Sequence, residues 1–162
     1  MTEHEHNDEC VHCQGHSMEE VVASYGEMIR EHGWAACAVV SETEPAWIYT
    51  LGLQGTYGHP ELVIYGLGPR LAHDLLRCTI EKIQRGEKIE PGTLVDEVMA
   101  DPYKMAAVKV DEPLDPRYPL NMATWFTDDA DIEAIQLVWP DAAGRYPWDE
   151  SGQPEQAVFG TF

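Results

Sequence analysis

Apolar residues recur three or four positions apart in two segments of the chain, as they do on one face of an α-helix. The first segment predicts a helix over residues 17–32, which begins at an S-x-x-E capping box and ends before Gly33. The second predicts a helix over residues 70–85, which begins after Pro69 and ends at Gly86. The pattern therefore predicts two main helices.

Short runs of apolar, β-branched and aromatic residues elsewhere predict strands. The five clearest runs are residues 34–41, 46–53, 61–66, 104–110 and 134–139. The connections among the first three are too short for a crossover helix, so these strands should pair antiparallel. A further short element, for which the sequence allows a helix, is expected at 93–99, and residues 121–126 fit neither pattern.

These elements predict one α+β domain with a largely antiparallel sheet packed by the two main helices. The chain has 162 residues, of which 44% are hydrophobic, which is enough for a sizeable core. Residues 1–16 form a polar tail rich in cysteine and histidine, and residues 17–162 form the single domain. No internal repeat or linker divides that domain.

The charge of the chain restricts its partners. Acidic residues outnumber basic ones by 29 to 10, which gives a net charge of -19. Such a chain repels nucleic acid and anionic lipid and favours a basic protein partner, although the charge also serves solubility. No apolar run reaches the roughly 18 residues of a membrane span, and the acidic start is unlike a secretory signal. A cytoplasmic protein is expected.

The polar tail holds the side chains best suited to bind a metal ion. Cys10 and Cys13 form a CxxC pair, which can place two sulfurs on one zinc ion. His16 follows at the same spacing, and His6 is the best fourth ligand, with His4 as another candidate. A ligand from a second subunit would instead make the protein a homo-oligomer. The alternative is a polar tail in which these residues bind nothing.

Two further segments carry side chains that could line a ligand or partner pocket. In the first, His59 and Glu61 flank a proline between two predicted strands, where they could act as acid and base. The second runs from residue 139 to 149 and is rich in Trp, Pro and Asp. Its candidate residues are Trp139, Asp141, Arg145, Trp148 and Asp149. In a purely structural arrangement, Asp141 would cap the turn through backbone N–H groups and Arg145 would pair with Asp149.

Several of these pieces resemble a bacterial and phage family known as domain of unknown function four-two-six-two. The matching pieces are CVHC in the tail, IREHGW, YTLGL at 49–53, PELVIYGL at 60–67 and IQLVWPDAAGRYPWD at 135–149. The resemblance covers about four fifths of the chain. It implies one small α+β domain, and it supplies no activity and no catalytic residue.

Two functions are compatible with these patterns. The first is a non-catalytic, metal-stabilised protein-binding module of the immunity, antitoxin or phage counter-defence type, with zinc in the tail and a basic partner. The second is a small enzyme or cofactor-binding protein whose pocket lies between the His59 loop and residues 139–149. The chain has no G-x-S-x-G, P-loop, G-x-G-x-x-G or H-E-x-x-H motif, so the common hydrolase, nucleotide-binding and protease chemistries lack their key residues.

Overall fold

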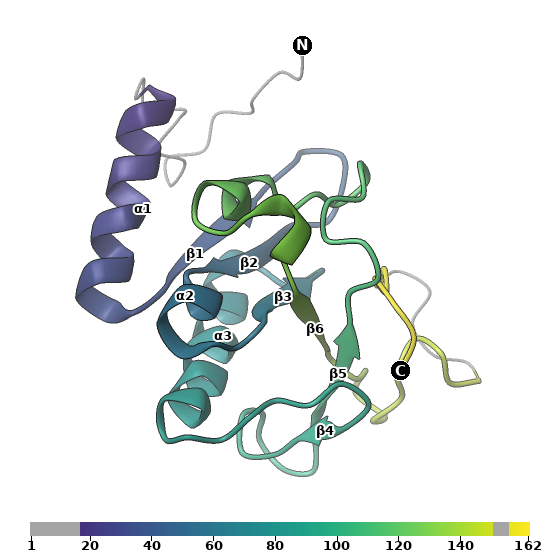
Figure 1. Ribbon diagram of the computed structural model, residues 1–162. Helices are drawn as coiled ribbons and strands as arrows, with labels where there is room; N and C mark the ends of the chain where they lie inside the picture. Colours follow the sequence, from purple (N-terminus) through teal and green to yellow (C-terminus); the bar gives the residue numbers. More distant parts are fainter. Residues whose placement is uncertain (1–16, 151–155) are drawn as a thin grey trace.

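The computed structural model describes residues 17–150 and 156–162 as one α+β domain built on a six-stranded sheet (Figure 1). The strands lie in the order β1-β2-β3-β6-β5-β4. Their bounds are β1 Ala35–Val39, β2 Trp47–Leu51, β3 Glu61–Tyr65, β4 Leu94–Val95, β5 Met105–Lys109 and β6 Ala134–Val138. All neighbours pair antiparallel except β3 and β6, which are parallel.

One face of the sheet is covered by helix α3 (Pro69–Gln84), which lies behind the sheet in Figure 1. Its buried side chains pack on alternate residues of the central strands, including Ile48, Leu62 and Ile135. This face is almost entirely aliphatic. Neither of the two cavities described below lies on this face.

The opposite face is aromatic and is covered mainly by irregular chain. Trp47, Tyr49 and Tyr65 project from β2 and β3 into a second cluster. The cluster is closed by part of helix α1 (Met18–His32), by the 3₁₀ helix η1 (Asn121–Trp125) and by the C-terminal segment 156–160. A second 3₁₀ helix, η2, spans Asp129–Asp131. We call this side the loop face.

Helix α1 ends where the chain must turn sharply onto β1. Ser17 caps its first turn by accepting a hydrogen bond from the Glu20 N–H, and Gly33 ends it in the left-handed conformation (φ 87°). In the last turn of α1, the side chain of Ile29 packs directly over Gly52. A Cβ at Gly52 would lie 2.9 Å from Ile29, so only glycine permits this approach.

The predicted fold class, both main helices and the antiparallel pairing of the first three strands are confirmed. Two local elements differ from what the sequence suggested. The loop after β2 contains a short helix, α2 (Leu53–Tyr57), and residues 93–99 contain the two-residue strand β4 instead of a helix. The ambiguous residues 121–126 form η1. No helix within residues 17–150 and 156–162 is long and apolar enough to cross a membrane.

Candidate functional site

The candidate zinc ligands Cys10, Cys13, His16 and His6 lie outside the described residues. Within the described ranges, no group of three or more His, Cys, Asp or Glu side chains could hold a metal ion.

His59 is a buried residue with both ring nitrogens engaged. It is 4% exposed, and its Nδ1 lies 2.8 Å from the Pro60 carbonyl oxygen, which can only accept a hydrogen bond. The Ile89 N–H donates to Nε2 at 3.0 Å, so Nε2 must be the unprotonated nitrogen. The ring is therefore neutral in this arrangement, and it ties the chain after α3 to the start of β3.

Glu61 is also buried, at 1% exposure, and its carboxylate is surrounded by donors. The Thr50 hydroxyl donates to it at 2.8 Å, and the N–H groups of Leu53 and Gln54 donate at 3.1 and 3.2 Å. Glu61 thereby satisfies the first N–H groups of α2. Burial raises the pKa of Glu61 to about 7, and the three hydrogen bonds oppose that rise. We call this arrangement the Glu61 nest.

The segment 139–149 is also closed on itself. Asp141 accepts hydrogen bonds from the N–H groups of Ala143 and Arg145, both at 2.9 Å, as expected for a turn cap. Arg145 pairs with Asp141, at 3.0 Å between Nε and the carboxylate, and the predicted pair with Asp149 is wrong. The carboxylate of Asp149 instead accepts from the Tyr146 N–H at 2.8 Å. Asp141, which the turn already holds in place, binds the guanidinium.

The tryptophans of this segment have different surroundings. Trp139 is half-buried, and its indole N–H donates to the Tyr65 carbonyl oxygen at 2.7 Å. Trp148 is 39% exposed and lies in a stack between Tyr146 and Phe162, with ring centroids 5.2 and 5.0 Å apart. Trp139 thus fastens the chain after β6 to the end of β3, while Trp148 is part of a surface stack.

The two predicted halves of a pocket do not meet. Glu61 starts β3 beside Ala134, which starts the parallel strand β6. Trp139 follows the other end of β6, where it bonds Tyr65 at the end of β3. A five-residue strand separates them by about 13 Å. None of the residues His59, Glu61, Trp139, Asp141, Arg145, Trp148 and Asp149 lines either of the two cavities described next.

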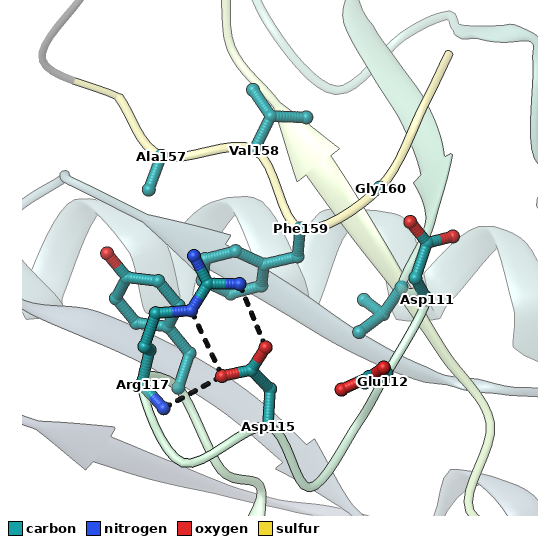
Figure 2. Close-up of a pocket in the computed structure, with 10 residues that line it drawn as sticks. Asp111, Glu112, Asp115, Arg117, Ala157, Val158, Phe159 and Gly160 are labelled. Atoms are coloured by element: carbon teal, nitrogen blue, oxygen red, sulfur yellow. Dashed lines mark hydrogen bonds and ion pairs between the residues drawn. The ribbon is translucent and has the colours of Figure 1, made fainter.

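Two neighbouring cavities lie instead on the loop face, on either side of the chain that carries Arg117. The larger, about 460 Å³, lies between residues 110–118 and residues 157–160 (Figure 2). The smaller, about 300 Å³, lies between β1, β2 and η1. Arg117 lines both of them. We call the larger one the acidic pocket and the smaller one the apolar pocket.

Aromatic rings form one side of the acidic pocket. Tyr118 and Phe159 stack with their centroids 4.5 Å apart and their planes 19° from parallel. Trp47 and Tyr65 contact this pair edge-on from the sheet, at 5.4 to 6.2 Å between centroids. The stacked pair is thus supported from below by rigid strands, and Tyr118 and Phe159 remain half-buried at the pocket.

The rest of the acidic pocket carries three carboxylates and one guanidinium. Asp115 forms a two-pronged pair with Arg117, at 3.1 Å from Nε and 2.9 Å from Nη2 (Figure 2). Hydrogen bonds from Arg117 lower the pKa of Asp115 to about 2. Asp111 and Glu112 are exposed, and within the described chain their side chains make no hydrogen bond or ion pair. The pocket therefore keeps a net negative charge.

The C-terminal wall of the acidic pocket is held in place by the side chain of Gln136. Buried Gln136 donates to the Ala157 carbonyl and accepts from the Phe159 N–H, each at 2.7 Å. The Phe159 carbonyl in turn accepts from the Asp111 N–H at 3.0 Å. The next residue is Gly160, where a Cβ would collide with the carbonyl oxygen of Lys109. A glycine at this point lets the chain lie against β5.

Sequence reasoning did not identify the acidic pocket. One signal was available: the segment from Pro113 to Pro119 combines prolines with Asp115, Arg117 and Tyr118, a composition typical of a surface-binding loop. Nothing in the sequence indicates that Phe159 stacks on Tyr118, because the two lie far apart along the chain and meet only across the sheet.

Comparison with known proteins assigns the family. Neither the curated proteins nor the solved structures contain a significant match to the chain. The family described as a domain of unknown function, DUF4262, matches residues 28–153. This range includes the whole sheet and the loop that carries Arg117. The resemblance inferred from the sequence is confirmed, and the chain belongs to the DUF4262 family.

Proposed function

We propose that this domain is a non-catalytic module that binds a basic segment of a protein partner, and that the acidic pocket receives an arginine side chain of that segment. The observation that carries the proposal is the pair Asp111 and Glu112. Both carboxylates line a cavity beside stacked aromatic rings, and neither forms a close ion pair in the described chain, although the charge of Glu112 acts on Arg117 in the same pocket. A cationic ligand would supply a close ion pair.

Arginine fits the pocket better than lysine does, because its planar guanidinium can both stack on a ring and bind a carboxylate through two N–H groups. The pocket contains both kinds of surface: the Tyr118–Phe159 stack and the free carboxylates. The pair formed by Arg117 and Asp115 is an internal example of the two-pronged geometry.

The charge of the chain supports the same partner. A net charge of -19 attracts basic surfaces over a distance of about a Debye length and speeds their encounter. A module of this kind suits immunity, antitoxin or phage counter-defence roles, in which a small acidic protein occupies the surface of its target.

Zinc binding by Cys10, Cys13, His16 and His6 is a separate proposal, supported by their type and spacing alone. In the module it would act as a structural ion for the tail, at a distance in sequence from the acidic pocket.

The test uses N-acetyl-arginine amide as a probe, added to the ¹⁵N-labelled full chain and followed by NMR. We expect amide shifts concentrated at residues 110–118 and 157–160. The double variant Asp111→Asn, Glu112→Gln should weaken binding about fivefold, which corresponds to about 1 kcal/mol for two partly screened charges. Its stability should stay within about 0.5 kcal/mol of the unmodified chain, since neither side chain is buried.

A matched variant, Glu27→Gln with Glu31→Gln, removes the same charge from exposed positions of α1 and should leave binding nearly unchanged. N-acetyl-citrulline amide, which has the shape of arginine without its charge, should not bind. Equal binding of citrulline and arginine, or shifts located away from the acidic pocket, would show the proposal to be wrong.

A further inference from the structure

We infer that the apolar pocket receives an apolar side chain of the same partner segment, so that the domain recognises an arginine and a neighbouring leucine-like residue together. This inference rests on the proposed function, and it specifies the sequence of the segment beyond its charge. It is carried by the lining of the apolar pocket, by its position beside the acidic pocket and by the charge of the chain.

The lining of the apolar pocket is mostly nonpolar. Cys37 and Val39 come from β1, Trp47 and Tyr49 from β2, and Met122 from η1. The volume of about 300 Å³ is ample for one aliphatic side chain. A leucine or methionine that enters the pocket would exchange water for apolar contacts on several sides.

The two pockets share their dividing wall. Arg117 lines both, and Trp47 of the apolar pocket contacts Tyr118 and Phe159 of the acidic pocket at 6.1 and 6.2 Å between centroids. A short extended peptide that crosses Arg117 can therefore place one side chain on each side of it. Successive side chains of an extended chain point in alternate directions at about 3.3 Å per residue. The arginine and the apolar residue can therefore be adjacent or separated by one residue.

The apolar pocket is already shaped before any ligand arrives. The Met122 N–H donates to the Tyr49 hydroxyl at 2.9 Å, which fixes η1 against β2. Tyr49 itself is 2% exposed and pairs through its strand with Cys37. Because the pocket is preformed, little free energy is lost in ordering its side chains when a ligand side chain enters.

The occupant is a basic partner and not a second copy of this chain. Two copies would bring together two net charges of -19, which repel each other. The apolar pocket does not offset this repulsion, because its only ionised lining residues are Glu44 and Arg117, whose charges cancel. A partner segment that contains arginine complements the adjacent acidic pocket, whereas a copy of this acidic surface would oppose it.

The experiment compares short peptides, each acetylated and amidated, by NMR titration of the full chain. The panel contains Arg-Leu, Leu-Arg, Arg-Ala-Leu and Leu-Ala-Arg, with Arg-Ser, Ser-Arg, Arg-Ala-Ser and Ser-Ala-Arg as matched controls. At least one leucine peptide should bind about tenfold more tightly than its serine control, since partial burial of a leucine side chain supplies that factor. Its additional shifts should fall on β1, β2 and η1.

Two variants that fill the apolar pocket check the location. Val39→Trp and Met122→Trp should each remove the advantage of leucine over serine and keep the affinity for N-acetyl-arginine amide. Circular dichroism establishes which variant is folded, and the leucine-to-serine comparison on the unmodified chain decides the question without either of them.

The outcomes separate the two ideas. If N-acetyl-arginine amide binds and no leucine peptide exceeds its serine control, the further inference is wrong and the proposed function stands. If the leucine advantage survives in a folded, filled variant, the apolar pocket is not its source and the inference is wrong. If neither arginine nor any arginine peptide binds, the proposed function itself fails.

Discussion

The Glu61 nest and the acidic pocket both contain carboxyl groups, and they differ in which groups bind the carboxyl oxygens. In the nest, one buried carboxylate accepts three hydrogen bonds from its own chain. In the pocket, Asp115 is paired with Arg117, whereas Asp111 and Glu112 have no such partner in the described chain. The first carboxylate holds the fold together, and the second group is available to another molecule.

This contrast shows why burial alone is a poor guide to function here. Glu61 has the features often associated with an active site, namely deep burial and a pKa raised to about 7. Yet it lines neither described cavity, and each of its contacts is with the start of α2 or with the neighbouring strand. The exposed carboxylates of the acidic pocket are the ones that a ligand can reach.

The largest expected effect that tests the contrast is loss of the Glu61 carboxyl group. Glu61→Ala leaves the N–H groups of Leu53 and Gln54 and the Thr50 hydroxyl without their acceptor. We expect the free energy of unfolding to fall by about 3 kcal/mol at pH 5, measured by urea denaturation. The affinity for N-acetyl-arginine amide, measured on the folded fraction, should not change. A stable Glu61→Ala variant that had lost arginine binding would reverse the roles assigned to the two sites.

The second effect is on the pH dependence of stability. The pKa of Glu61 is about 7 in the folded chain and near its ordinary 4.5 in the unfolded chain. Between these two pH values, the folded state therefore holds a proton that the unfolded state has lost. Stability should therefore be greatest below about pH 4.5 as far as Glu61 is concerned, and it should fall as the pH rises through 7. Between pH 5 and pH 8 this loss is on the order of 2 to 3 kcal/mol.

Glu61→Gln cannot ionise, so this variant should lose less stability than the unmodified chain over the same pH range. The matched control is Glu27→Gln, which removes an exposed carboxylate from α1 and should keep the full slope. Urea denaturation at pH 5, 6, 7 and 8 measures the slopes. Equal slopes in all three proteins would show that the Glu61 carboxylate is not protonated in the fold.

The smallest effect on both sites is expected from removal of zinc. If Cys10, Cys13, His16 and His6 hold the ion, metal analysis of untagged protein should give about one zinc per chain, and Cys10→Ser with Cys13→Ser should release it. Because these ligands precede Ser17, the cap of α1, neither the slope due to Glu61 nor arginine binding should change. A metal-free protein that is fully folded would contradict the zinc proposal.

Local sequence determined the elements whose stabilising contacts are themselves local. Ser17, Gly33 and a regular apolar face define α1, and the apolar runs define the central strands. Helix α2 was missed because its N-terminal N–H groups are satisfied by Glu61, which follows the helix in the chain and reaches it only when β3 pairs with β2. The turn at Asp141 was predicted because its acceptor and donors are within four residues.

The surface that we propose as a binding site was decided by tertiary structure. The sequence alone determined that the chain is one acidic α+β domain, because charge and periodicity can be counted along the chain. Which carboxylates are available depends on pairing across the sheet. Gln136 brings Phe159 beside Tyr118, and the parallel pair of β3 and β6 sends His59 and Trp139 to opposite ends. Such contacts join distant residues, and only the packed sheet fixes their distances.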